Sequence, residues 1–144
     1  MRIALGSDHG GFEYKEIIKE RLINAGYEIV DIGVLSNQAV DYPDIAVEVS
    51  NTVVAGDADC GILFCGTGIG MSIAANKVKG IRAALCTDTF SARMAKQHNN
   101  ANIITLGART LGIELAYEII TAYLSEEFLG DRHLRRVNKI DAIC

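Results

Sequence analysis

The sequence predicts an α/β fold of three layers, in which helices cover both faces of a five-stranded parallel sheet. Apolar stretches of strand length alternate along the chain with segments of helical periodicity. The run at residues 62–65 is apolar without alternation, which is typical of a central strand covered on both faces. Strand–helix–strand connections of this kind are right-handed and join parallel strands. These observations together predict an open parallel sheet.

The amino-terminal part of the chain supplies the first two strands and the helix between them. Residues 2–5 form a short apolar strand. Residues 12–25 carry apolar side chains at helical spacing, and Gly26 is the stop signal that follows them. Residues 27–32 are predicted to form the second strand and residues 33–42 a loop.

The middle of the chain supplies the second helix and the central strand. Pro43 suits the first turn of a helix that Gly56 ends. The strand at residues 62–65 then leads into a glycine-rich turn and a helix start, all within residues 61–77. Glycine permits positive φ and close approach of a ligand, and helix N-termini favour negative charge. We therefore expect an anion at this turn.

The remaining strands and helices follow the same alternation. Residues 81–86 and 102–106 are predicted strands, residues 87–99 a loop and helix, and residues 112–126 a long amphipathic helix. The last residues, 131–144, form a short basic segment. No internal repeat or linker-like change in composition divides the 144 residues, so one domain is expected.

Composition and charge restrict the class of protein. The formal net charge of -4 argues against nucleic acid as a partner. No apolar run approaches the roughly 20 residues that cross a membrane, and no secretory signal follows Met1, so a soluble cytoplasmic protein without a membrane partner is expected. The histidines are scattered and the cysteines lack CxxC spacing, so neither a metal site nor a disulfide framework is predicted. The cysteines are Cys60, Cys65, Cys86 and Cys144.

Polar residues follow several predicted strands at the edge where open parallel sheets bind ligands. They are Asp8, His9, Cys65, Thr67, Asp88 and Arg109. His98 is expected to reach the same edge from the end of its helix. Asp8 and His9 also suit a helix cap, and His98 suits the C-terminal end of a helix dipole. The convergence of these residues on one edge favours a functional site.

The glycine-rich loop at residues 66–70 does not match the common phosphate-binding motifs. A Walker loop requires Gly-Lys-Ser/Thr, which is absent here. A dinucleotide fingerprint is closer, because Asp88 lies at a suitable distance downstream, but Met71 occupies the place of its third glycine. A phosphate-cleaving cysteine loop would need an arginine at that same place. The loop therefore suits an oxyanion that forms during a reaction, or neutral hydroxyls, better than a phosphate dianion.

Two roles are open for Cys65. A free cysteine at the end of a buried strand is most often a small apolar core residue. A thiol beside a helix N-terminus is also suited to act as a base. The other three cysteines lack such a setting and are expected to be structural.

The basic tail contains two arginines at helical spacing. Arg132 and Arg136 are four residues apart, so on a helix both guanidinium groups face one side and can hold a single phosphate. A solvated basic end is the alternative. A segment this short does not fold alone, so the tail must dock on this subunit or on a neighbour.

Six stretches of the chain form a recognisable set. They are GSDHGGFE at residues 6–13, DYPD at 41–44, CGTGIGMSIAANK at 65–77, GIRAALC at 80–86, HN at 98–99 and LGAR at 106–109. Together they resemble the ribose-5-phosphate isomerase B family, which also holds allose- and galactose-6-phosphate isomerases. The resemblance implies a Rossmann-like subunit without a metal or organic cofactor, in a homodimer or tetramer with sites between subunits. It also implies that the tail at residues 131–144 docks at that interface.

The resemblance further implies a reaction and a role for each site residue. The enzyme would interconvert ribose 5-phosphate and ribulose 5-phosphate of the pentose phosphate pathway, with Cys65 moving a proton between C2 and C1 and Thr67 assisting at the enediolate. The anion hole would be formed by the amides of Gly66, Thr67, Gly68, Ile69 and Gly70. The ring would be opened by His98 aided by Asp8, the sugar held by Tyr42 and Asn99, and the phosphate bound by His9, Arg109, Arg132 and Arg136. Some of these residues would come from the partner subunit.

Two residues depart from the pattern of the family. Gly10 stands where many relatives have alanine, and Asp131 replaces a glycine beside the first arginine of the tail. The negative charge of Asp131 is expected to weaken phosphate binding slightly. Three alternative functions stay open at this point: an allose-6-phosphate isomerase, a dinucleotide-binding enzyme, and a sensor that binds sugar phosphates without turnover.

Overall fold

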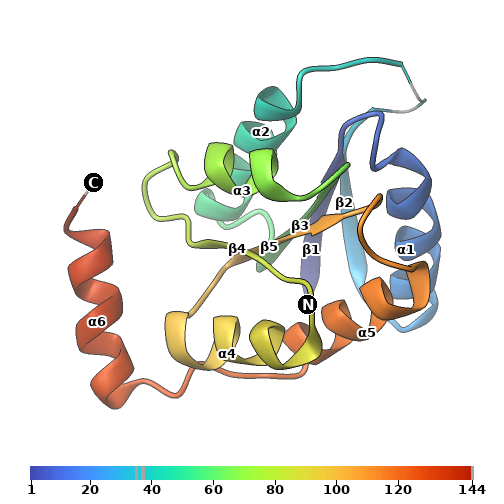
Figure 1. The fold of residues 1–144 in the computed structure, drawn as a ribbon. Coiled ribbons are helices and arrows are strands. Elements are labelled where there is room, and N and C mark those ends of the chain that lie inside the picture. Colours follow the sequence, from blue (N-terminus) through green and yellow to red (C-terminus); the bar gives the residue numbers. More distant parts are fainter. Residues whose placement is uncertain (35, 37, 144) are drawn as a thin grey trace.

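The computed structural model describes residues 1–34, 36 and 38–143, and it has the predicted α/β architecture (Figure 1). Five parallel strands form one sheet in the order β2-β1-β3-β5-β4. The strands are β1 (Arg2–Ser7), β2 (Glu28–Gly33), β3 (Cys60–Cys65), β4 (Ala83–Leu85) and β5 (Ile103–Gly107). The helices are α1 (Phe12–Asn24), α2 (Tyr42–Val54), α3 (Ile69–Ala75), α4 (Thr89–Asn99), α5 (Ile113–Leu124) and α6 (Asp131–Asp141). Over these described ranges, none of the helices is long and apolar enough to cross a lipid bilayer.

Each face of the sheet has its own apolar core. On one face α1, α4 and α5 pack through side chains such as Ile18, Ala95 and Ile119. On the other face α2 and α3 pack through Val49 and Met71. β3 lies at the centre of the sheet and is buried along its whole length, as its non-alternating apolar sequence predicts. The prediction of three layers is therefore confirmed.

β4 differs most from its predicted length. The sequence predicts a strand over residues 81–86, whereas the ladder with β5 extends only from Ala83 to Leu85. β4 is an edge strand whose side chains are partly exposed, so no second neighbour extends its pairing. Its amino end is instead held by side chains, because Asn76 both donates to the Ala83 carbonyl and accepts from the Ala83 amide, each at 2.8 Å.

The parallel register brings three loops together at the carboxyl edge of the sheet. Cys65 at the end of β3 is paired with Gly107 at the end of β5. Ser7 at the end of β1 is paired with Phe64 on the other side of β3. The loops that follow β1, β3 and β5 therefore begin side by side, as a parallel sheet of this order requires.

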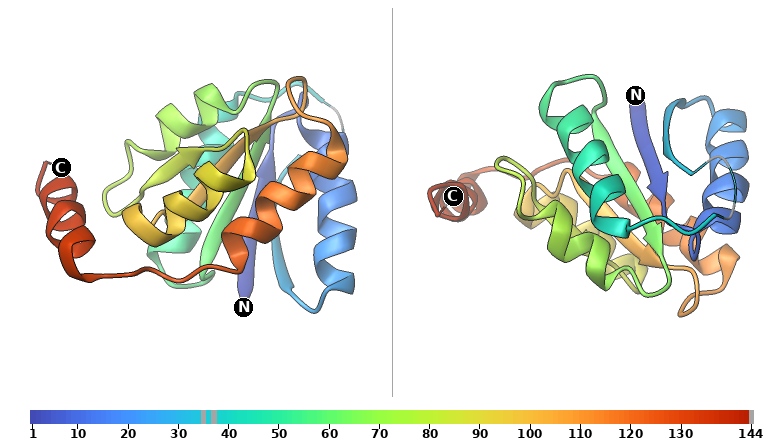
Figure 2. Two further views of the ribbon diagram at one scale, coloured as in Figure 1. Left: turned by 60° about the horizontal axis from the view of Figure 1, so that its bottom comes forward. Right: turned by 90° about the horizontal axis from the view of Figure 1, so that it is seen from above.

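The basic tail forms helix α6, which stands beside the body of the protein and packs against α4 (Figures 1 and 2). The connection between α5 and α6 is held by the Leu129 amide, which donates to the Gln97 carbonyl at 3.1 Å. The far end of α6 is held by Asp141, which accepts from Arg82 at 2.9 Å. On α6 only the side toward the body is buried, through His133 and Val137. The tail thus docks on its own subunit through one narrow face.

Candidate active site

The loop between β3 and α3 surrounds the thiol of Cys65 with backbone groups. Gly68 has a φ of 79°, which only glycine adopts readily, and its amide donates to Sγ of Cys65 at 3.0 Å. Its carbonyl accepts a hydrogen bond of 2.8 Å from the buried hydroxyl of Thr105. Cys65 itself is 5% exposed. A buried sulfur that accepts an amide hydrogen bond at the start of a helix is placed where negative charge on it is stabilised.

Cys60 and Cys86, the other cysteines in the described part of the chain, have no comparable surroundings. Burial raises the pKa of the Cys60 thiol to about 11, and it has the same effect on Cys86. Both side chains belong to the core formed by α1, α4 and α5. These two match the structural role that the sequence assigns to them, and Cys144 lies outside the described residues.

Tyr42 lies over the start of α3 because Gly70 has no side chain. A methyl group at position 70 would come within 2.6 Å of the tyrosine ring. The ring belongs to the first residue of α2 and is 41% exposed, so the phenol stands at the rim of the glycine-rich loop. Gly70 is thus explained by packing against Tyr42, and the neighbouring Met71 is a buried core residue. This arrangement differs from the dinucleotide motif, in which a third glycine at the place of Met71 would allow the helix to approach a strand.

Arg109 and Asp8 complete this edge of the sheet. The Arg109 amide donates to the Gly66 carbonyl at 2.9 Å, and its side chain lies directly over Gly66. Asp8 is buried and accepts a 3.1 Å hydrogen bond from the Gly11 amide at the start of α1. A methyl group at Gly10 would contact three of these groups, at 3.3 Å from Oδ1 of Asp8, 3.4 Å from the Gly66 nitrogen and 3.7 Å from Nη2 of Arg109.

The residues gathered at this edge form the first half of the candidate site, which we call the thiol half-site. It consists of Asp8, His9, Tyr42, residues 65–70 and Arg109. All of these were predicted from the sequence. The loops after β1, β3 and β5, which carry all of these residues except Tyr42, are joined by hydrogen bonds, so their relative positions are fixed by the sheet.

His98 lies at the opposite edge of the sheet from Cys65. α4 begins beside the carboxyl end of β4 and runs back to the amino end of β5, so its last residues lie next to Arg82, which donates to the Asn99 carbonyl at 3.1 Å. The prediction that His98 reaches the carboxyl edge within one chain is therefore wrong. The helix returns along the sheet, and the five residues of β5 put about 13 Å between the two edges.

The second half of the candidate site, which we call the histidine half-site, is built from the end of α4 and from α6. It consists of His98, Asn99, Arg132, His133 and Arg136. Arg132 and Arg136 are exposed on α6, as the helical spacing predicts. The ring of His133 is stacked on that of His98, with 4.3 Å between centroids and 6° between planes.

His133 is the residue of this group that the sequence reasoning missed. The feature of the sequence that could have identified it is its spacing to Val137. These two residues are four apart and form the buried side of α6. Burial lowers the pKa of the His133 imidazole, and so do the neighbouring His98, Arg132 and Arg136. A neutral ring is thereby favoured next to His98.

Asp88 does not belong to either half-site. Its carboxylate caps α4, with one oxygen accepting from the Ser91 amide and the other from the Ser91 hydroxyl, both at 2.7 Å. These hydrogen bonds lower the pKa of Asp88. Because both oxygens serve the helix cap, the carboxylate is not presented to the ribose of a dinucleotide, which is the role that the fingerprint requires.

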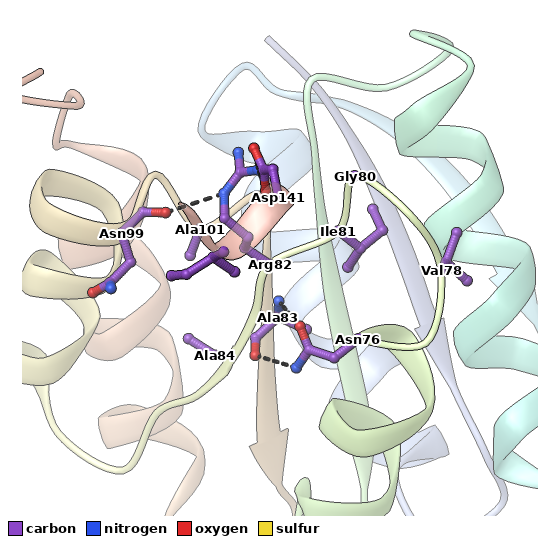
Figure 3. A pocket seen from close by; sticks show the side chains of 11 residues that line it. Asn76, Val78, Gly80, Ile81, Arg82, Ala83, Ala84, Asn99, Ala101 and Asp141 are labelled. Atoms are coloured by element: carbon purple, nitrogen blue, oxygen red, sulfur yellow. Dashed lines mark hydrogen bonds and ion pairs between the residues drawn. The ribbon is translucent and has the colours of Figure 1, made fainter. Parts of the chain in front are cut away.

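A cleft of about 390 Å³ lies between α6 and the start of β4, at the amino edge of the sheet (Figure 3). Asn99 lines it, and so do Arg82 and Asp141, which form an ion pair. The cleft therefore adjoins the histidine half-site. It is separated from Cys65 by the length of the strands.

Comparison with known proteins agrees with this architecture. Residues 3–140 match the family model described as Ribose/Galactose Isomerase. The chain is 50% identical over 141 residues to the putative sugar phosphate isomerase YwlF of Bacillus subtilis, and the matched region covers 97% of this chain and 95% of that protein. It is 46% identical over 142 residues to ribose-5-phosphate isomerase B of Escherichia coli, with coverage of 99% and 95%.

Solved structures give the same result. A structure of Clostridium thermocellum ribose-5-phosphate isomerase B superposes with a TM-score of 0.98 and is 51% identical, over 99% of this chain and 97% of that one. The fold and the sequence thus agree along almost the whole chain. The protein belongs to the ribose/galactose isomerase family.

Proposed function

We propose that the protein is an aldose–ketose isomerase that interconverts D-ribose 5-phosphate and D-ribulose 5-phosphate through an enediolate. The observation that carries the proposal is the thiol of Cys65, which is buried at the carboxyl edge and accepts a hydrogen bond from the Gly68 amide of the glycine-rich loop. The relatives named ribose-5-phosphate isomerase B support the choice of substrate. A cytoplasmic location, which keeps thiols reduced, suits a cysteine base.

The reaction needs a base and a site for negative charge. Cys65 removes the proton from C2 of the open-chain aldose and returns it to C1, while the charge develops on the oxygens of the enediolate. Amides of residues 66–70 donate to those oxygens, and the hydroxyl of Thr67 assists. A positioned base increases the reaction rate about 10²- to 10⁴-fold, and preorganised hydrogen-bond donors increase it by a comparable factor. The proposed reaction uses neither a metal nor an organic cofactor.

The remaining residues hold the substrate and open its ring. His98, aided by Asp8, opens the furanose, and Tyr42 and Asn99 hold the sugar hydroxyls. The phosphate is bound by His9, Arg109, Arg132 and Arg136. Guanidinium groups bind phosphate in a bidentate manner, which fits the two exposed arginines of α6.

A complete site requires two copies of the chain, because Asp8 and His98 lie at opposite edges of one sheet. We infer a homodimer in which the thiol half-site of each subunit meets the histidine half-site of the other. Exposed apolar side chains on the adjoining elements α3, β4 and α4 support such a contact. They are Ile69, Ile73, Leu85 and Phe90. A two-fold axis would form both sites at once, and the same surfaces permit a tetramer of two dimers.

The experiment that tests the base is replacement of Cys65. We expect Cys65→Ala to lower kcat for ribose 5-phosphate about 10³-fold or more, because the proton then lacks an acceptor at C2. Cys86→Ala is the matched control, since it removes a buried thiol outside both half-sites. Near-normal turnover by the Cys65 variant would remove this residue from the role of base.

The size of the sugar is tested separately. We expect kcat/KM for ribose 5-phosphate to exceed that for allose 6-phosphate, since the named relatives are ribose-5-phosphate isomerases. A higher kcat/KM for allose 6-phosphate would instead identify the protein as an allose-6-phosphate isomerase. Binding of ribose 5-phosphate without any turnover would instead indicate a sensor.

A further inference from the structure

The stacked imidazoles of His98 and His133 are an unusual contact at the end of α4. The rings are almost parallel, with 6° between planes and 4.3 Å between centroids. His133 is 6% exposed, while His98 is partly exposed on the last turn of its helix. One ring is therefore held by the protein, and the other lies on it with its far side accessible.

The stack determines how the ring of His98 can move. A histidine side chain has two torsions, and its ring torsion is broad unless packing restricts it. Against the face of a buried ring, the imidazole of His98 keeps its plane. Two positive imidazoles would repel at this distance, and the guanidinium groups of Arg132 and Arg136 already disfavour a charge on His133.

We propose that His133 is a positioning residue that fixes the plane of the His98 imidazole for opening the furanose ring of the substrate. This role rests on the proposed function. In ring opening a proton leaves the anomeric hydroxyl, the bond between C1 and the ring oxygen breaks with its electron pair passing to that oxygen, and the ring oxygen takes up a proton. His98 acts at these oxygens. His133 touches none of the reacting atoms: its ring stacks on His98 and accepts a long hydrogen bond of 3.5 Å from Nε of Arg132.

The position of His133 on α6 fits this role. It lies between Arg132 and Arg136, the two arginines proposed to bind the phosphate. In ribose 5-phosphate the phosphate is on C5 and the ring oxygen is on C4, so the two groups are on adjacent carbons. A helix that binds the phosphate is therefore close enough to orient the residue that acts at the ring oxygen.

The test separates ring opening from proton transfer at carbon. Conversion of ribose 5-phosphate requires both steps. Exchange of the C1 hydrogen of ribulose 5-phosphate with D₂O requires only the base, since this ketose has its C5 hydroxyl blocked by phosphate and stays open-chain. We expect His133→Ala to lower kcat for ribose 5-phosphate about ten- to hundredfold. KM and the rate of C1 exchange, followed by NMR, should change by less than about twofold, because the base and the arginines remain.

Two further variants make the result specific. His133→Phe keeps a flat ring in contact with His98 and should restore most of the lost kcat. Arg135→Ala, an exposed change on the opposite side of the same helix, should leave conversion and exchange unchanged. An unchanged kcat in His133→Ala would overturn the proposal, as would a parallel loss of conversion and exchange or a failure of phenylalanine to restore activity. Absence of any conversion by the unsubstituted protein would instead contradict the proposed function.

Discussion

Asp131 shows how one residue can serve folding and binding in opposite ways. It begins α6 with a φ of 45°, a conformation that glycine adopts without strain and that aspartate tolerates better than most residues. The departure from the family's glycine is thus tolerated by the backbone. An acidic residue in the first turn also stabilises a helix N-terminus. The same negative charge adjoins Arg132, whose proposed task is to bind a phosphate.

We therefore predict that Asp131→Gly lowers KM for ribose 5-phosphate about two- to threefold, since a repulsive charge near the phosphate is removed. Asp131→Asn is the matched comparison, because asparagine keeps the shape and tolerates the left-handed conformation but has no charge. Steady-state kinetics of the two variants should give similar KM values. A lower KM in the glycine variant alone would show that the backbone, rather than the charge, limits binding.

At the scale of elements, a partly buried charge cluster fixes α1 to β2. Lys15 is fully buried, and its ammonium group lies 2.6 Å from Asp31 and 2.8 Å from Glu16. Lys19 reaches the second oxygen of Asp31 at 2.6 Å. Burial alone would raise the pKa of Asp31, but hydrogen bonds from Lys15 and Lys19 outweigh it, so the pKa is lowered.

The sign of the pH dependence follows from that shift. The folded protein keeps Asp31 ionised to a lower pH than the unfolded chain does, so the stabilisation is fully present above about pH 5 and is lost as the pH falls through the folded pKa. We expect Asp31→Asn to lower the free energy of unfolding by about 2 kcal/mol at pH 7. The loss is limited because Glu16 still pairs with the buried Lys15. Urea unfolding at pH 3 should show a smaller difference. Glu114→Gln, which breaks an exposed pair with Arg21, should change the free energy of unfolding far less than Asp31→Asn does at pH 7.

Helix α6 is the element that links the tail to the proposed chemistry. We predict that a double Arg132→Ala, Arg136→Ala variant raises KM for ribose 5-phosphate about 100-fold or more, because it removes two charged hydrogen bonds to phosphate that contribute about 1.5–3 kcal/mol each. The change in kcat should be small, since the base and the anion hole are untouched. Arg135→Ala removes a charge from the same helix and should leave KM unchanged. An unaltered KM in the double variant would remove these arginines from the phosphate site.

At the scale of the whole molecule, the alternation of strands and helices was sufficient to predict the sheet and its layers. Apart from Tyr42, which only the family resemblance indicated, the thiol half-site followed from the same pattern, because residues after parallel strands share an edge whatever the strand order. The position of His98 did not follow, since it depends on which way α4 runs relative to that edge. His133 was missed because only the docking of α6 on α4 shows that this residue faces His98.

The central claim is that each active site combines the thiol half-site of one subunit with the histidine half-site of another. It is tested most directly by mixing two inactive variants, Cys65→Ala and His98→Ala, after unfolding and refolding them together in equal amounts. Half of the resulting dimers would contain one copy of each variant, and one of the two sites in each such dimer would have both residues intact.

The measurement is the rate of ribulose 5-phosphate formation by the mixture. Shared sites predict about a quarter of the activity of the unsubstituted protein, far above that of either variant refolded alone. Sites contained within single subunits predict no gain, because every subunit then lacks either the base or the histidine. Activity of the mixture equal to the mean of the two variants would therefore contradict the account.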